Sequence, residues 1–191
     1  MSSPRIVALA GSIRRNSWNT KLIRVAADAA QTAGGEVTLL DLADYPLPLM
    51  DEDLEAASGP PEHATRLKEI FKASDGILLA CPEYNSSITP LLKNTIDWLS
   101  RKGAGEPPLA AFKGKVCGLL SASTGQLGGL RGLVAVRSIL GNIGVLVLPD
   151  QVAVPQADKA FDDTGRLTDP QRQSAVERVA QTLVEVTTRL R

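Results

Sequence analysis

The sequence predicts an α/β fold built on a doubly wound parallel sheet with helices on both faces. Short, β-branched apolar segments alternate about five times with longer segments whose apolar residues recur at helical spacing. The short segments are apolar throughout, as strands buried on both faces are. The chain has 191 residues, of which 43% are apolar. We therefore expect a single domain over residues 1–191, with five strands in the order 2-1-3-4-5.

The expected elements follow each other in regular order. We expect strands at residues 5–10, 36–41, 76–81, 115–122 and 145–148, and helices at 20–33, 62–73, 130–140 and from Pro90 and Pro170 onward. Gly34 and Gly35 end the first helix, while Thr89 and Asp169 each cap a helix that starts with proline. Residues 42–61 contain four prolines and an acidic cluster, and we expect a long loop there.

Charge and hydropathy exclude several kinds of partner. The 21 basic and 21 acidic residues cancel, and no run of Lys or Arg stands out, so we expect neither nucleic acid nor a membrane surface as a partner. No apolar run approaches the roughly 20 residues of a membrane span. Met1 to Pro4 lack the pattern of a signal peptide, and we expect a cytoplasmic protein.

The two cysteines and the single histidine show no catalytic or metal-binding spacing. Cys81 and Cys117 each lie in or at the end of a strand-like segment, which predicts two small buried hydrophobic side chains. Their spacing predicts neither zinc nor a disulfide. His63 has no second histidine or cysteine near it, so we expect an exposed helix position and no metal.

Three unusual loops follow the first, third and fourth predicted strands. In open α/β sheets, ligands bind beyond the carboxyl ends of the strands, where the strand order reverses. For the order 2-1-3-4-5 that point lies between strands one and three. The loops at residues 11–19, 82–89 and 121–129 therefore converge on one expected site.

The loop from Gly11 to Asn19 has the composition of a phosphate-binding loop. It leads into a helix N-terminus, where free N–H groups and the helix dipole attract anions. Ser12, Ser17 and Asn19 can add hydrogen bonds, and Arg14 or Arg15 can pair with a phosphate. The loop is neither GxxxxGK[ST] nor GxGxxG, which disfavours a P-loop hydrolase and a tightly held dinucleotide. A monophosphate such as FMN fits.

The other two loops can accommodate a flat ring. Tyr84, at the carboxyl end of the third strand, offers a stacking surface, and neighbouring N–H groups can face the edge of a flavin. Small residues between Ser121 and Gly129 let the backbone approach a ligand closely.

Together the three loops resemble those of the NADPH-dependent FMN reductase family, which includes bacterial quinone, chromate and azo-dye reductases. The matching residues are Gly11, Ser12, Arg14, Ser17 and Asn19; Pro82, Glu83, Tyr84, Asn85 and Ser87; Leu92, Lys93, Asn94, Ile96, Asp97 and Trp98; and Ser123, Gly125, Gly128, Gly129 and Arg131. The resemblance covers most of residues 5–150. At position 86 this chain has serine where some relatives carry an aromatic residue.

The resemblance implies a flavodoxin-like fold, non-covalent FMN, NAD(P)H as co-substrate and a small electron acceptor such as a quinone. It implies that Ser12, Arg14, Ser17 and Asn19 hold the phosphate, that Pro82, Glu83, Tyr84 and Asn85 contact the isoalloxazine ring, and that Ser123 and Gly125 lie on its other side; Trp18 is also expected to contact the cofactor. Such proteins form homodimers or homotetramers, often through the helix after the second loop. Trp98 on that helix is either an interface residue or packed within one subunit. We expect no catalytic side chain, since hydride transfer through FMN requires no acid or base.

Three other functions are alternatives to this hypothesis. A flavodoxin-type electron carrier would bind FMN without oxidising NAD(P)H itself, although such carriers often have acidic surfaces and this chain is neutral. A flavin-binding protein that acts by association with a partner is the second. The third, a low-molecular-weight phosphatase, needs an arginine six positions after a cysteine. Ser87 stands at that spacing from Cys81 and Ser123 from Cys117, so the sequence excludes this function.

Overall fold

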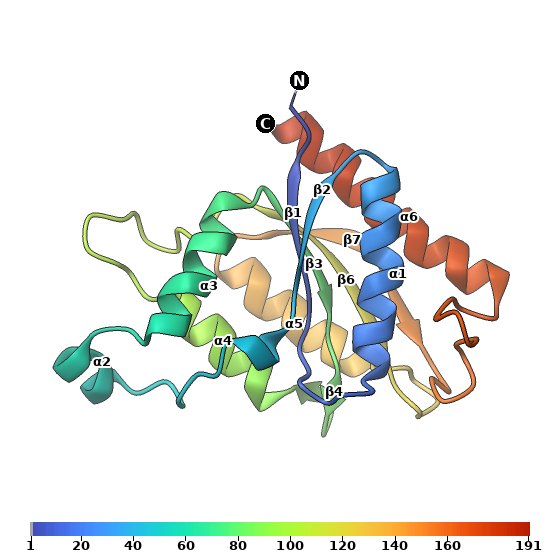
Figure 1. Cartoon of the computed structure of the whole chain (residues 1–191), viewed down its shortest axis with the longest axis horizontal. Helices are drawn as coiled ribbons and strands as arrows, with labels where there is room; N and C mark the ends of the chain where they lie inside the picture. The colour runs from blue at the N-terminus through green and yellow to red at the C-terminus, as the bar shows by residue number, and fades with distance from the viewer. Residues whose placement is uncertain (1) are drawn as a thin grey trace.

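The computed structural model describes residues 2–191 and contains the predicted parallel sheet (Figure 1). Its strands are β1 (Arg5–Ala10), β2 (Glu36–Leu40), β3 (Gly76–Ala80), β6 (Val116–Ala122) and β7 (Leu146–Val154). They lie side by side in the order β2-β1-β3-β6-β7, and every neighbouring pair is parallel. Counted along the chain within this sheet, the order is 2-1-3-4-5, so the predicted flavodoxin-like topology is confirmed.

Helices cover both faces of the sheet (Figure 1). The helices α1 (Trp18–Thr32) and α6 (Pro170–Leu190) lie on one face; α3 (Glu62–Ala73), α4 (Pro90–Ser100) and α5 (Leu130–Asn142) lie on the other. The residues of β1 alternate between the two hydrophobic cores: Ile6 and Ala8 belong to the α1–α6 side, and Val7 and Leu9 to the opposite side. Both faces of the central strands are therefore buried, which explains their uniformly apolar sequence.

The last strand runs six residues further than predicted. The sequence predicted an end at Leu148, but β7 continues through Pro149 to Val154. β7 is an edge strand, so the missing N–H of proline removes no ladder bond that the sheet needs. The register shifts between Cys117 and Leu119 opposite this segment, and the guanidinium of Arg137 donates hydrogen bonds to carbonyl oxygens there.

The expected long loop at residues 42–61 contains two short helices. A 3-10 turn, η1, spans Leu42–Asp44, and α2 spans Glu52–Ser58. The carboxylate of Asp51 accepts hydrogen bonds from the N–H groups of Asp53 and Leu54, 2.8 and 3.3 Å away, which is the capping role that Asp favours. α2 has no buried residue, which explains why no apolar pattern revealed it.

Trp98 is packed within its own chain. Its side chain is 1% exposed, and its indole N–H donates a 2.8 Å hydrogen bond to the carbonyl oxygen of Pro48. The side-chain amide of Asn94 donates to the same oxygen at 2.8 Å. Helix α4 thus anchors the segment between β2 and α2, and the interface role considered for Trp98 has no support.

Both cysteines are free and buried, as predicted. Burial is the main cause that raises the pKa of the Cys81 thiol to about 12, and the charge of Glu83 adds to it. Burial likewise raises the pKa of Cys117.

The prediction of an exposed position for His63 was wrong. His63 lies on α3, as predicted, but it is half-buried, and its ring lies edge-on to that of Tyr45 with the centroids 6.1 Å apart. Among residues 2–191, no group of three His, Cys, Asp or Glu side chains could hold a metal ion.

In the part of the chain that the structure describes, no helix is long and apolar enough to cross a membrane.

Candidate functional site

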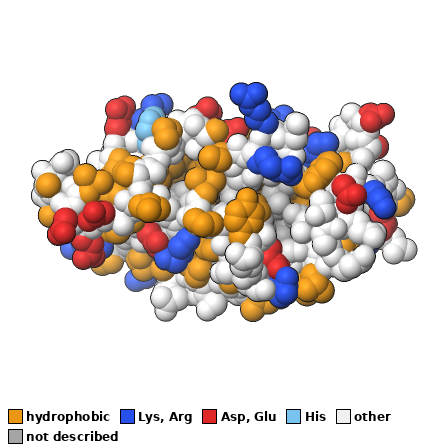
Figure 2. Space-filling view, turned by 90° about the horizontal axis from the view of Figure 1, so that it is seen from below, with side chains coloured by type: hydrophobic (Ala, Val, Ile, Leu, Met, Phe, Trp, Pro, Cys, Tyr) orange, Lys and Arg blue, Asp and Glu red, His pale blue; other side chains and the backbone are white. Residues whose placement is uncertain are grey.

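A cavity of about 270 Å³ lies at the carboxyl ends of β1, β3 and β6. It is lined by Ser12, Arg14, Ser17, Trp18, Asn19, Pro82, Glu83, Tyr84, Ala122, Ser123 and Thr124. All three loops singled out in the sequence therefore contribute to one cavity, and only Asn85 and Gly125 of the predicted residues do not line it. Figure 2 looks onto this lower edge, where scattered hydrophobic side chains lie across the middle and several Lys and Arg side chains lie above them.

The first loop leaves the sheet at Gly11 through a crowded junction. The N–H of Gly11 donates to the carbonyl oxygen of Ala80 at 2.9 Å, and its own carbonyl accepts from the Thr89 hydroxyl at 2.8 Å. A Cβ at this position would lie 3.0 Å from the Cβ of Leu92 and 3.2 Å from the ring of Pro82. Glycine is therefore required here for close packing of loop and helix.

The start of α1 presents an anion-binding surface to the cavity. Ser17 is the N-cap, and its hydroxyl accepts from the N–H of Thr20 at 3.4 Å. The N–H groups of Trp18 and Asn19, in the first turn, have no acceptor within the helix. Arg14 lies at the rim, and its guanidinium makes no ion pair with any residue in the range 2–191. A helix N-terminus, a hydroxyl and an unpaired guanidinium together suit a phosphate group.

The side chain of Asn19, which lines the cavity, is bonded to the backbone at the end of β6. It is 4% exposed; its amide oxygen accepts from the N–H of Ala122 at 2.9 Å, and its amide nitrogen donates to the carbonyl oxygen of Ala122 at 2.8 Å. This pair of bonds joins the start of α1 to the end of β6. No local pattern in the sequence signals a contact between residues 103 positions apart.

The second loop is a small hairpin. β4 (Glu83–Tyr84) pairs antiparallel with β5 (Ser87–Ile88), and Asn85 and Ser86 connect them with φ values of 50° and 67°. Two left-handed residues in succession match the turn that best fits the twist of a two-residue hairpin. Tyr84 is 58% exposed, which leaves its ring available for stacking.

Glu83 lines the cavity but directs its carboxylate toward the start of α5. Oε2 accepts from the N–H groups of Arg131 and Gly132 at 2.9 and 3.1 Å, and Oε1 lies 2.6 Å from Nη2 of Arg131. Burial alone would raise the pKa of Glu83, but the guanidinium of Arg131 and these backbone donors outweigh it and hold the pKa below its usual range.

The third loop is held by glycines that contact backbone directly. Gly128 and Gly129 have φ values of 61° and 89°, and a Cβ on Gly128 would lie 2.6 Å from the carbonyl carbon of Val154. The hydroxyl of Ser121 donates to the carbonyl oxygen of Gly128 at 2.7 Å. The loop therefore takes a single course between β6 and α5.

The segment 155–165, which the sequence left without an interpretation, lies against the third loop and Trp18. The N–H of Ala157 donates to the carbonyl oxygen of Ser123 at 3.0 Å. Phe161 stacks on Trp18 with ring centroids 5.9 Å apart and an interplanar angle of 8°. Since Trp18 lines the cavity, this segment supports the cavity wall from outside.

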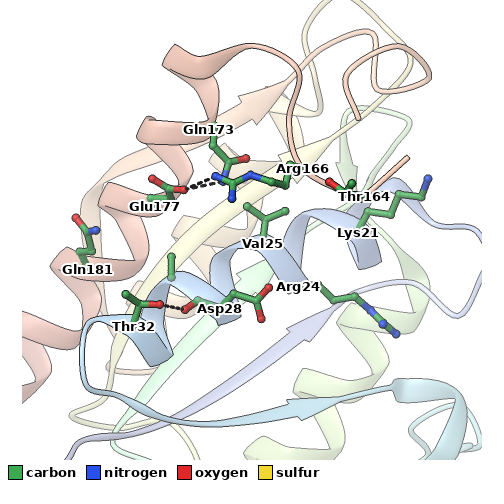
Figure 3. A pocket seen from close by; sticks show the side chains of 12 residues that line it. Lys21, Arg24, Val25, Asp28, Thr32, Thr164, Arg166, Gln173, Glu177 and Gln181 are labelled. Atoms are coloured by element: carbon green, nitrogen blue, oxygen red, sulfur yellow. Dashed lines mark hydrogen bonds and ion pairs between the residues drawn. The ribbon is translucent and has the colours of Figure 1, made fainter. Parts of the chain in front are cut away.

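Two larger hollows lie away from the strand ends. The groove between α1 and α6, about 450 Å³, is lined by charged and amide side chains, among which Glu177 binds Gln173 and Arg166 (Figure 3). The other, about 630 Å³ beside α3, holds Glu106 against Lys68 at 2.5 Å, within reach of Lys72 as well. These lysines lower the pKa of Glu106 to about 2. Neither hollow lies at the carboxyl ends of the strands, where ligands bind in open α/β sheets, which favours the strand-end cavity as the ligand site.

Known proteins with related sequences and structures point the same way. The family model described as NADPH-dependent FMN reductase matches residues 4–159. An NAD(P)H-dependent FMN reductase of Pseudomonas aeruginosa is 34% identical over 188 residues, which cover 98% of this chain and 97% of that protein. A quinone reductase of Escherichia coli is 33% identical over 167 residues, covering 86% and 85%.

A solved structure extends the likeness to three dimensions. The flavoenzyme NAD(P)H:(acceptor) oxidoreductase FerB from Paracoccus denitrificans superposes with a TM-score of 0.82 at 27% identity, and the match covers 97% of this chain and 98% of that one. The resemblance noted in the three loops is thereby confirmed over nearly the whole chain. This chain belongs to the NADPH-dependent FMN reductase family and is an oxidoreductase that uses FMN and NAD(P)H.

Proposed function

We propose that this enzyme passes electrons from NAD(P)H, through FMN held in the strand-end cavity, to a quinone-like small molecule. The observation that carries the proposal is the cavity itself: the N-terminus of α1 and Arg14 lie on one side of it and the exposed ring of Tyr84 on another. The Escherichia coli relative at 33% identity is named a quinone reductase, which supports this class of acceptor.

In this proposal the cavity residues divide into two groups. Ser12, Arg14 and Ser17, with the backbone N–H groups of Trp18 and Asn19, hold the phosphate. The hairpin residues Pro82, Glu83, Tyr84 and Asn85 lie along the isoalloxazine ring, and Ser123 and Gly125 lie across from them. When bound there, FMN would supply the chemistry of hydride acceptance and electron transfer. The chain binds and orients the reactants, and N–H dipoles favour negative charge at the ring edge.

We also propose that residues 1–191 form one FMN-binding domain that assembles as a homodimer or homotetramer in the cytoplasm. Leu127, Leu130 and Val134 are 50%, 42% and 62% exposed and lie at or near the start of α5, which contacts the hairpin. An exposed apolar stripe of this kind is typical of a contact surface between subunits.

The cytoplasmic location is supported by the cysteines. Both are unpaired, which favours a reducing compartment.

The test begins with the visible spectrum of the purified protein after incubation with FMN. Uptake of FMN together with steady NADPH or NADH oxidation in the presence of a benzoquinone supports the proposal. Uptake without such oxidation favours the electron-carrier alternative. A colourless protein that takes up no FMN contradicts the proposal altogether.

A further inference from the structure

The contact between the second loop and α5 is unusually complete. The Glu83 side chain is 8% exposed, and its carboxylate accepts two backbone N–H groups from the first turn of α5. The N-cap of that helix is Gly129, which has no side chain to satisfy them. Glu83, 48 residues earlier in the chain, therefore supplies the negative group that this helix N-terminus lacks.

The backbones of the two elements also touch. A Cβ on Gly132 would lie 3.2 Å from the Cβ of Glu83 and 3.4 Å from the carbonyl oxygen of Ser87. A hairpin with two residues in each strand has no independent stability. The position of this hairpin therefore depends on what holds it to the rest of the protein, and α5 provides many of its contacts.

We infer that Glu83 is a positioning residue: its carboxylate fixes the hairpin, and with it Tyr84, against the start of α5, so that the ring side of the cavity is formed before the cofactor arrives. This inference rests on the proposed function in placing the flavin ring beside the hairpin. Glu83 holds the hairpin by bonding to α5, because both of its carboxylate oxygens accept hydrogen bonds from Arg131 or Gly132.

The quantitative consequence follows from population arithmetic. If only a fraction of molecules has the hairpin in place, the observed dissociation constant for FMN rises by the inverse of that fraction. Removal of the Glu83 carboxylate removes its hydrogen bonds to α5. Their free energy is large enough for this loss to weaken FMN binding by roughly tenfold.

A matched ion pair on α6 distinguishes this arrangement from an ordinary surface salt bridge. Glu185 and Arg189 also form a carboxylate–guanidinium pair, but their side chains are 57% and 74% exposed. Exposed pairs one helical turn apart contribute little to the free energy of unfolding.

An exchange of the two charges also separates the two cases. An arginine at position 83 and a glutamate at position 131 would not restore the contact, because a guanidinium at 83 would face N–H groups and the positive end of the α5 dipole.

The experiment measures hydrogen–deuterium exchange and FMN affinity on the same variants. For Glu83→Ala we expect faster exchange at the amides of residues 84–88 and 131–132, about tenfold weaker FMN binding by fluorescence titration, and an altered visible circular dichroism of the bound flavin. Arg131→Ala keeps the helix cap and has a smaller effect. The exchange of charges, Glu83→Arg with Arg131→Glu, gives no rescue, and Glu185→Ala matches the parent.

Three results overturn the inference. They are an unchanged FMN affinity and flavin dichroism in Glu83→Ala, full rescue by the exchange of charges, and an effect of Glu185→Ala equal to that of Glu83→Ala.

If Glu83→Ala does not fold, Glu83→Gln and Gly132→Ala test the same contact. Gly141→Ala is the control for Gly132→Ala, since a Cβ at position 141 meets nothing within 4 Å. If the parent protein takes up no FMN, the proposed function fails, while the exchange data alone report whether Glu83 holds the hairpin.

Discussion

The side chain of Asn19 and the backbone of Ala122 form two hydrogen bonds, 2.8 and 2.9 Å long, that join the start of α1 to the end of β6. The side-chain amide is well suited to this contact because one end donates and the other accepts. The first and third loops are thereby held in fixed relation to each other.

Replacing Asn19 tests this contact. Asn19→Ala leaves a buried N–H and a buried carbonyl without partners, which costs about 2–4 kcal/mol in the free energy of unfolding. Asn19→Asp is at least as damaging, because a carboxylate would face the carbonyl oxygen of Ala122. Urea denaturation measures both, with the exposed Asn16→Ala as control. A loss below 0.5 kcal/mol in Asn19→Ala would falsify the structural role.

The two arginines of the first loop provide a matched pair. Arg14 lines the cavity, whereas the adjacent Arg15 does not. We expect Arg14→Ala to raise the dissociation constant for FMN by about tenfold, since a charge-assisted bond to phosphate is lost, and Arg15→Ala to have little effect. Riboflavin, which lacks the phosphate, should bind both variants and the parent equally. Equal losses of FMN affinity in the two variants would refute the assignment.

Gly128 tests the course of the third loop. Gly128→Ala combines an unfavourable positive φ with a Cβ 2.6 Å from backbone, whereas Gly34→Ala has the positive φ with nothing within 4 Å. Gly34→Ala should cost about 1 kcal/mol of stability, and Gly128→Ala clearly more, with loss of FMN uptake. Thermal unfolding and flavin titration measure the two effects. If both variants were equally stable, the close contact with Val154 would not constrain the loop.

The thiol of Cys81 gives a prediction about pH. Its pKa of about 12 lies above the ordinary value of 9.0, so between these values the unfolded chain loses the proton first. The free energy of unfolding should therefore fall as pH rises above 9, by up to about 1.4 kcal/mol per pH unit for this group.

Comparison of the parent with Cys81→Ala isolates the contribution of Cys81. The variant should lose less stability between pH 9 and pH 11, and the native parent should react with a thiol reagent at pH 8 only after denaturant is added. Rapid reaction of the native protein would contradict the burial of both cysteines.

The strand order and most helix boundaries could be read from the sequence because their signals are local. Apolar runs buried on both faces identify β1, β3 and β6, and a cap followed by proline marks the starts of α4 and α6. The elements that were missed lack such signals. α2 buries no residue, and β7 continues past Pro149, which an edge strand tolerates.

The sequence by itself determined the fold class, the family resemblance and the three loops that meet at the strand ends, because each depends on residue types at short spacing. Only the tertiary structure decided what individual side chains in those loops do. Asn19 bonds to Ala122 and Glu83 to the start of α5, and Phe161 supports Trp18 from a segment without any motif. These partners lie far apart in the chain, and a hydrogen bond or a ring stack forms only where the fold brings both groups within contact distance.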